Sequence, residues 1–296
     1  MTREGAWHAS LPGIMRRTFE AAYEDNIAFL ASGLSFDLLL TLIPFIFLLL
    51  AVLAYLVQHQ ITTEQISLHE LLARLLPIVP DRSGRDAFQG VEGVLSAVLQ
   101  RRGRLTLIGV PLFLWFSTRL FGGLRAALND VFDTDESRAW PVAKSVDVFM
   151  VFVTGVFLVA NGMLAAYEAH NTEVVSASFL VHWAWRFSME VVAFALDIAM
   201  FFVVFKLLPG RRINWRTALV AATFCSLGFE VTKDLYTLYV ARFVTFDRVA
   251  SDANVAALLL FLLWVYYTCY LFLLSGEVAE TFDLILMRRA QRVRLG

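Results

Sequence analysis

Apolar residues occur along this chain in six blocks, each long enough to cross a lipid bilayer as a helix. A helix rises about 1.5 Å per residue, so about 20 residues cross the roughly 30 Å hydrocarbon layer. The pattern therefore predicts an all-α, polytopic membrane protein with a single six-span domain. The expected spans are residues 27–57, 105–121, 146–167, 185–208, 218–243 and 255–282. Pro44 lies inside the first span and removes a backbone hydrogen bond, which predicts a kink there.

Two segments outside these blocks have the spacing of amphipathic helices. Near the N-terminus, apolar residues recur beside Arg16 and Arg17, which suits a short helix at the membrane surface or a solvated leader. Charged residues interrupt this segment, so we expect it to remain on the mature protein rather than act as a signal peptide. The loop 58–104 carries two apolar periodicities, at 68–76 and 88–99. They predict two amphipathic helices, which either form a lid or surface sensor or cover exposed helix ends.

The composition agrees with a membrane protein and removes several classes of function. Hydrophobic residues make up 58% of the chain, and Lys plus Arg number 25 against 26 Asp plus Glu. Without a basic excess, nucleic acid is not an expected partner. Cys225 and Cys269 lie inside apolar blocks, the five histidines are scattered outside them, and no phosphate-binding loop occurs. We therefore expect no metal, no cofactor and no enzymatic activity.

The distribution of basic residues predicts the orientation. The side that includes both termini carries thirteen Lys and Arg residues near the spans, and the opposite side carries seven. Basic flanks resist translocation, so both termini should be cytoplasmic. Arg101, Arg102 and Arg104, directly before the second span, run against this assignment.

Charged residues inside the apolar blocks are the candidate functional residues. An ionisable side chain near the bilayer centre costs about 2.5 to 3.5 kcal/mol on insertion scales, so it must face protein, water or a partner charge. The candidates are Asp37 in the first span, Arg119 in the second, Glu190 and Asp197 in the fourth, Glu230, Lys233 and Asp234 in the fifth, and Glu277 in the sixth. The acids outnumber the bases, so pairing alone cannot neutralise all of them.

These charges allow two interpretations. They could line a water-accessible cavity that binds a cation or relays protons during transport. Alternatively they are structural: Lys233 pairs with Glu230 or Asp234, and Arg119 pairs across helices. Asn161 in the third span could bridge two helices by a hydrogen bond.

Four stretches, in this order, resemble the YihY/BrkB family of bacterial inner-membrane proteins, which has also been labelled ribonuclease BN. They are residues 26–44 (NIAFLASGLSFDLLLTLIP), 124–129 with the polar run to Arg138, 207–216 (LLPGRRINWR) followed by Phe229-Glu230 and Lys233, and 262–267 (LLWVYY) leading to Ser275-Gly276-Glu277. The resemblance covers about residues 15–285. Asp37 departs from it, since an aromatic or small polar residue is expected at that position.

The resemblance implies six spans in the bacterial inner membrane, with both termini cytoplasmic, and points to serum resistance, envelope integrity or export. We expect a transporter or lipid-translocating protein of the envelope, with membrane lipids and an unidentified solute or lipid as partners. The oligomeric state, including a homo-oligomer, stays open. The alternative is a non-catalytic scaffold that supports envelope integrity through the 58–104 loop. Ribonuclease activity is not expected, because the chain lacks the clustered histidines and acids that metal-dependent nucleases need.

Overall fold

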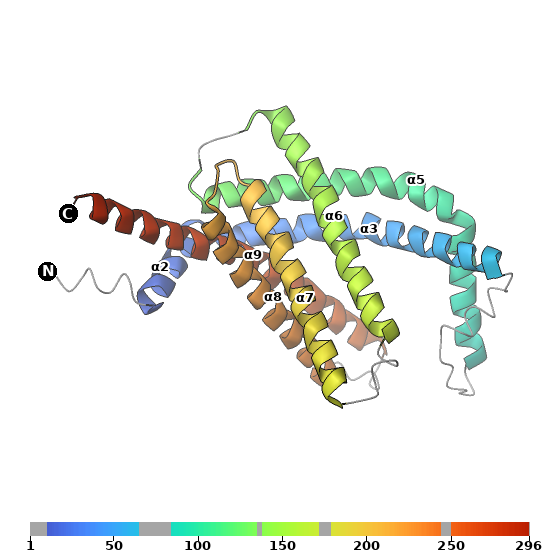
Figure 1. Cartoon of the computed structure of the whole chain (residues 1–296). Helices are drawn as coiled ribbons and strands as arrows, with labels where there is room; N and C mark the ends of the chain where they lie inside the picture. Colours follow the sequence, from blue (N-terminus) through green and yellow to red (C-terminus); the bar gives the residue numbers. More distant parts are fainter. Residues whose placement is uncertain (1–10, 65–83, 135–137, 172–178, 244–249, 296) are drawn as a thin grey trace. The chain divides into compact units, whose positions relative to one another are not determined.

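A computed structural model describes residues 11–64, 84–134, 138–171, 179–243 and 250–295. Within these ranges the regular structure is entirely helical, which confirms the all-α prediction. The helices are α2 (Leu11–Glu24), α3 (Ile27–Glu64), α5 (Gly84–Val131), α6 (Trp140–Asn171), α7 (Phe179–Leu207), α8 (Trp215–Phe243) and α9 (Ala250–Leu295), as Figure 1 shows.

Five of the described helices contain segments long and apolar enough to cross a membrane. The segments are Ile27–Val52, Leu99–Val131, Trp140–Tyr167, Trp183–Leu207 and Leu258–Ile285. The expected fifth span, 218–243, lies in α8, which has 29 residues like α7 but carries Glu230, Lys233 and Asp234 in its C-terminal half. The chain is therefore a helical protein with several potential membrane spans, and α8 as the sixth span stays a prediction.

Helices α3 and α5 extend well beyond the spans predicted there. α3 continues through Pro44 to Glu64, and α5 begins at Gly84 and passes through Arg104 into the second span without a break. The periodic segment 88–99 is thus the first part of α5 rather than a separate helix. The helix expected at 68–76 lies outside the described residues. A kink at Pro44 stays a prediction.

The chain divides into two compact units, residues 39–117 and the remainder, and the six-span single domain stays a prediction. In the smaller unit, the later part of α3 packs against the earlier part of α5. A Cβ on Gly109 would lie 3.1 Å from Leu48 Cδ2, and the rings of Phe45 and Phe113 are 6.0 Å apart. Glycine at position 109 therefore allows the two helices to approach closely.

The larger unit is built around α7, α8 and α9. α8 packs against both of the other helices, α6 packs against α7, and α2 packs against α9 (Figure 1). Phe205 stacks on Phe272 with ring centroids 4.7 Å apart. Phe132, Phe205, Leu128 and Leu273 are fully buried, so the best-packed core lies where the ends of α5 and α7 meet the middle of α9.

The predicted N-terminal helix exists as α2. Met15, Phe19 and Tyr23 are exposed on one face at a spacing of four residues, whereas Thr18 and Ala22 are buried. Thr18 lies against α9, where its hydroxyl is 3.4 Å from that of Thr281. A hydrogen bond to Glu20 raises the pKa of the exposed Arg16 guanidinium. The position of α2 at a membrane surface stays a prediction.

Candidate functional site

Three helices bring together four of the polar side chains that lie inside the predicted spans. The Asn161 side-chain amide on α6 donates a hydrogen bond to Asp197 Oδ1 on α7, at 3.0 Å. On α8, Lys233 Nζ lies 2.6 Å from Glu230 Oε2. Asp197 is also within electrostatic range of Glu230 and Lys233. We call Asn161, Asp197, Glu230 and Lys233 the intramembrane cluster.

The intramembrane cluster is half open rather than sealed. The side chains of Glu230 and Lys233 are 35% and 49% exposed, although both sit in the middle of a predicted span. With two acids and one base, the cluster keeps a formal excess of negative charge. Exposed charges inside a membrane span need water, a headgroup or a partner molecule beside them.

The other predicted residues form separate local groups. Asp37 on α3 pairs with Arg119 on α5, with Oδ1 and Nε 2.9 Å apart. Glu190 lies 3.9 Å from Arg186 one turn earlier on α7, and both side chains are more than half exposed. Asp234 is exposed on α8. The charges expected to line one path are therefore divided among several places on the helices.

Glu277 also lies away from the intramembrane cluster. It is fully buried in α9, and the acidic groups that act on it are Asp25, Glu280 and Asp133. A Cβ on the preceding Gly276 would lie 2.9 Å from Val131 Cγ1. The small residue before Glu277 thus allows α9 to approach the end of α5.

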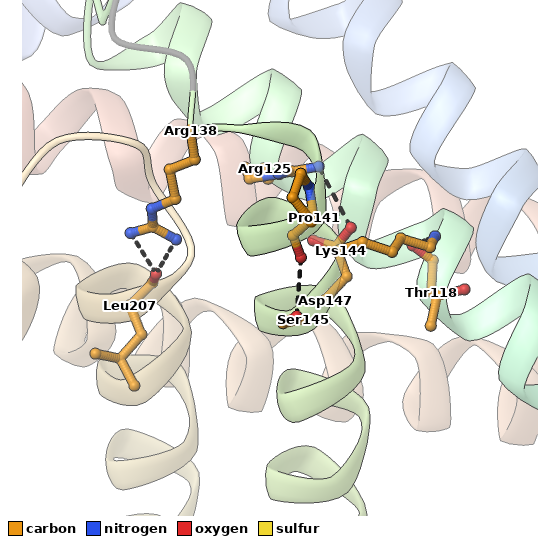
Figure 2. A network of polar contacts seen from close by, with 8 residues as sticks. All are labelled: Thr118, Arg125, Arg138, Pro141, Lys144, Ser145, Asp147 and Leu207. Atoms are coloured by element: carbon orange, nitrogen blue, oxygen red, sulfur yellow. Dashed lines mark hydrogen bonds and ion pairs between the residues drawn. The ribbon is translucent and has the colours of Figure 1, made fainter.

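A further ion pair, which the sequence did not single out, joins α5 to α6. Arg125 lies 3.3 Å from Asp147, whose side chain is 1% exposed (Figure 2). Lys144 Nζ donates to the Thr118 carbonyl in the same network, at 3.4 Å. Asp147 is the second residue of the predicted span 146–167. An acid at the start of a span was therefore the sequence signal that could have marked Asp147 as a candidate.

A hydrogen bond joins the C-terminal end of α5 to the segment that follows α7. Asp133 adopts a left-handed conformation with φ 44°. Its amide donates to the Asp130 carbonyl, and the Thr134 amide donates to the Asn129 carbonyl, which is the Schellman arrangement that ends a helix. The Asn129 side chain then accepts a hydrogen bond from the Gly210 amide at 2.7 Å.

Arg138 strengthens the same junction at the end of α7. It donates to the Leu207 carbonyl at 3.1 Å and to the Pro209 carbonyl at 2.7 Å, and Figure 2 shows its guanidinium facing Leu207. A cation at a helix C-terminus satisfies orphan carbonyls and interacts favourably with the helix dipole. Two of the stretches that carried the family resemblance are therefore in direct contact.

Asp283 and Glu280 are further buried acids that the sequence analysis missed. Asp283 accepts a hydrogen bond from the Thr217 hydroxyl at 3.0 Å and lies 3.8 Å from Arg211. Glu280 is 9% exposed. Both stand near the end of the last predicted span, where an acid is ordinarily expected to reach water.

An apolar cavity of about 230 Å³ is formed in part by the same three helices that carry the intramembrane cluster. Residues from α3, α5, α6, α7, α8 and α9 line it, including Thr154, Phe201, Cys225, Phe229 and Leu271. Phe201 follows Asp197 by four residues, and Thr154 precedes Asn161 by seven, so each shares a helix face with its polar neighbour. The cavity and the cluster therefore occupy adjoining positions on α6 and α7.

In the part of the chain that the structure describes, no three His, Cys, Asp or Glu side chains gather so as to hold a metal ion. The described residues thus give no support to metal-dependent RNA cleavage.

The helices and their buried charges define a polytopic α-helical membrane protein. The chain belongs to the virulence factor BrkB family, whose model matches residues 18–292, and this confirms the family resemblance. It is 22% identical to the putative ribonuclease-like protein YfkH of Bacillus subtilis, over 84% of this chain and 87% of YfkH. It is 26% identical to the UPF0761 membrane protein IL2447 of Idiomarina loihiensis, over 70% of this chain and 69% of that protein.

A third relative is considerably longer. The UPF0761 membrane protein PsycPRwf_0630 of Psychrobacter is 25% identical over 85% of this chain, which spans 45% of that protein. No solved structure matches the chain. The relatives' names identify a membrane protein family and leave the activity to be inferred from the site.

Proposed function

We propose that this chain moves a lipid or another amphiphile across the bacterial inner membrane. In this proposal the protein spans the membrane six times, with α8 as the fifth span and both termini cytoplasmic. The intramembrane cluster contacts the polar headgroup, and the apolar cavity beside it receives part of the hydrocarbon chain. The scaffold function has no comparable feature among the described residues.

The observation that carries the proposal is an apolar cavity next to an open charged cluster. The cavity, at about 230 Å³, is smaller than the roughly 300 to 1,000 Å³ of ordinary ligand pockets. Its lining of aliphatic and aromatic side chains offers few hydrogen bonds to a polar solute. An amphiphile satisfies both surroundings at once, because its two ends differ in polarity.

The charges of the cluster suit transient rather than tight contact with a headgroup. Lys233 can attract a phosphate, while Glu230 and Asp197 repel it and can attract an amine. Because Lys233 and Glu230 are already paired, a headgroup competes with an existing ion pair and need not bind strongly. A translocation pathway requires such weak, reversible binding.

The test is translocation of a fluorescent phospholipid in proteoliposomes of phosphatidylethanolamine and phosphatidylglycerol. The wild-type chain should accelerate exchange between leaflets, and Asp197→Asn and Glu230→Gln should abolish the acceleration while insertion stays intact. Glu190→Gln is the matched control, since Glu190 lies on α7, as Asp197 does, but forms an exposed ion pair with Arg186. It should behave as the wild type.

Two results would contradict the proposal. If wild-type chain leaves lipid exchange at the rate of empty vesicles, lipid translocation is wrong. If Glu230→Gln and Asp197→Asn retain full activity, the intramembrane cluster has no part in the mechanism.

A further inference from the structure

The carboxyl group of Glu277 is buried without hydrogen-bond partners among the described residues, and the proposed function gives it no role. Its side chain is 0% exposed, and both of its carboxyl oxygens are buried without a hydrogen-bond donor among the described residues. An ionised carboxylate in such a place is costly, because it can only accept hydrogen bonds.

The groups around Glu277 make an ionised state still less favourable. Asp25, in the turn between α2 and α3, lies within hydrogen-bonding range of it, and Glu280 and Asp133 add negative charge nearby. The basic residues Arg211 and Arg17 act on the neighbouring Glu280, and Arg211 is also 3.8 Å from Asp283.

The backbone holds Asp25 in this position. The Asp25 amide bonds the Ala21 carbonyl at the end of α2, and Asn26 adopts a left-handed conformation with φ 51° before α3 begins. Asparagine tolerates this conformation better than most residues. Ile27, which follows, is 1% exposed, so the chain directly after the turn is anchored in the core.

We propose that Asp25 and Glu277 form a carboxyl pair that binds one proton, which makes this end of the helix bundle a proton-binding site. Two carboxyl groups can share a hydrogen bond only if one of them carries a hydrogen, as in the dyads of aspartic proteases. The proton comes from water and forms one O–H bond, and no other bond changes. The site is separate from the intramembrane cluster.

The exposure of the neighbouring acids provides a connection to the aqueous phase. Glu277 is fully buried, Asp25 is half-buried, and Asp133 is exposed. A proton can therefore enter at Asp25, the more exposed member of the pair, and reach Glu277 from there. Burial of the inner group keeps the bound proton from exchanging directly with bulk solvent.

Infrared spectroscopy of the full chain in lipid nanodiscs tests the site without a transport assay. A protonated carboxylic acid has a carbonyl stretch that an ionised carboxylate lacks. The wild-type chain should show this band at neutral pH, and Glu277→Gln should lose it. Asp25→Asn should shift the band, since it changes the group that shares the proton, and the control Glu190→Gln should leave it unchanged.

A pH series of unfolding provides a second readout. If the folded chain holds a proton that the unfolded chain releases at neutral pH, stability must fall as pH rises. The folding equilibrium constant should fall about tenfold per pH unit from this group alone, and Glu277→Gln should remove that dependence. The Gln amide can donate to Asp25, so this variant should fold.

The proposal is overturned if the band is absent from wild type or survives unchanged in Glu277→Gln. It is also overturned if sodium at constant pH stabilises wild type but not Glu277→Gln and removes the band, because a metal ion then occupies the site. Failure of lipid translocation leaves these spectra unaffected, so the two proposals fail independently.

Discussion

Removing Arg125 should destabilise the chain strongly, because it leaves Asp147 buried without its ion-pair partner. The two side chains are 21% and 1% exposed, and Nη2 of Arg125 lies 3.3 Å from Oδ2 of Asp147. Breaking a buried pair by removing one partner costs about 3 to 5 kcal/mol. Lys144 and Arg138 also act on Asp147 and soften the loss, so we expect Arg125→Ala to cost about 3 kcal/mol.

The assay is reversible unfolding in mixed micelles, with free energies of unfolding compared between variants. Arg186→Ala is the matched control, since it breaks an exposed pair with Glu190 and should cost about 0 to 1 kcal/mol. Asp147→Asn should partly rescue Arg125→Ala, because the uncompensated charge is gone. The reasoning is refuted if Arg125→Ala and Arg186→Ala cost the same, or if the double variant is no more stable than Arg125→Ala.

Two further predictions concern close packing and the junction between connections. Gly276→Ala should cost about 1 to 3 kcal/mol, because its Cβ would meet Val131 at 2.9 Å, whereas Gly155→Ala, with open space around it, should be neutral or stabilising in the same unfolding assay. Equal effects would contradict the packing argument. Asn129→Ala should cost about 0.5 to 1.5 kcal/mol by removing the hydrogen bond to Gly210, and faster amide exchange at Gly210 should accompany the loss. Unchanged exchange would show that this bond does not hold the connection.

The sequence was informative where a local pattern determines the structure. Blocks of apolar residues predicted the helices, since length and composition alone decide whether a segment can cross a bilayer. Helical spacing also left Glu230 and Asp234 as the two partners for Lys233 under the structural interpretation, and the structure pairs Lys233 with Glu230.

Contacts between distant segments could not be obtained in this way. Nothing in the spacing of Asp147 or Arg125 shows that they meet, because that depends on how α5 and α6 pack. The same holds for Asn129 and Gly210, which are 81 residues apart. Glu277 was expected near Glu230, yet its neighbours come from the turn after α2 and the end of α5. Ionisable residues near span ends were undervalued because such side chains usually reach water.

In the proposed mechanism α8 spans the membrane, and water or a headgroup reaches one face of it. Labelling with a membrane-impermeant maleimide tests this directly, in a background where the buried Cys225 and Cys269 are replaced by Ala. The Lys233 side chain is 49% exposed and Val231 is 66% exposed. The two residues lie on different faces of the helix. In intact membranes Lys233→Cys should label and Val231→Cys should not, while both should label after solubilisation and unfolding. Equal labelling in intact membranes would place α8 in water, and no labelling of Lys233→Cys would show that the intramembrane cluster is closed to water; either result would contradict the account.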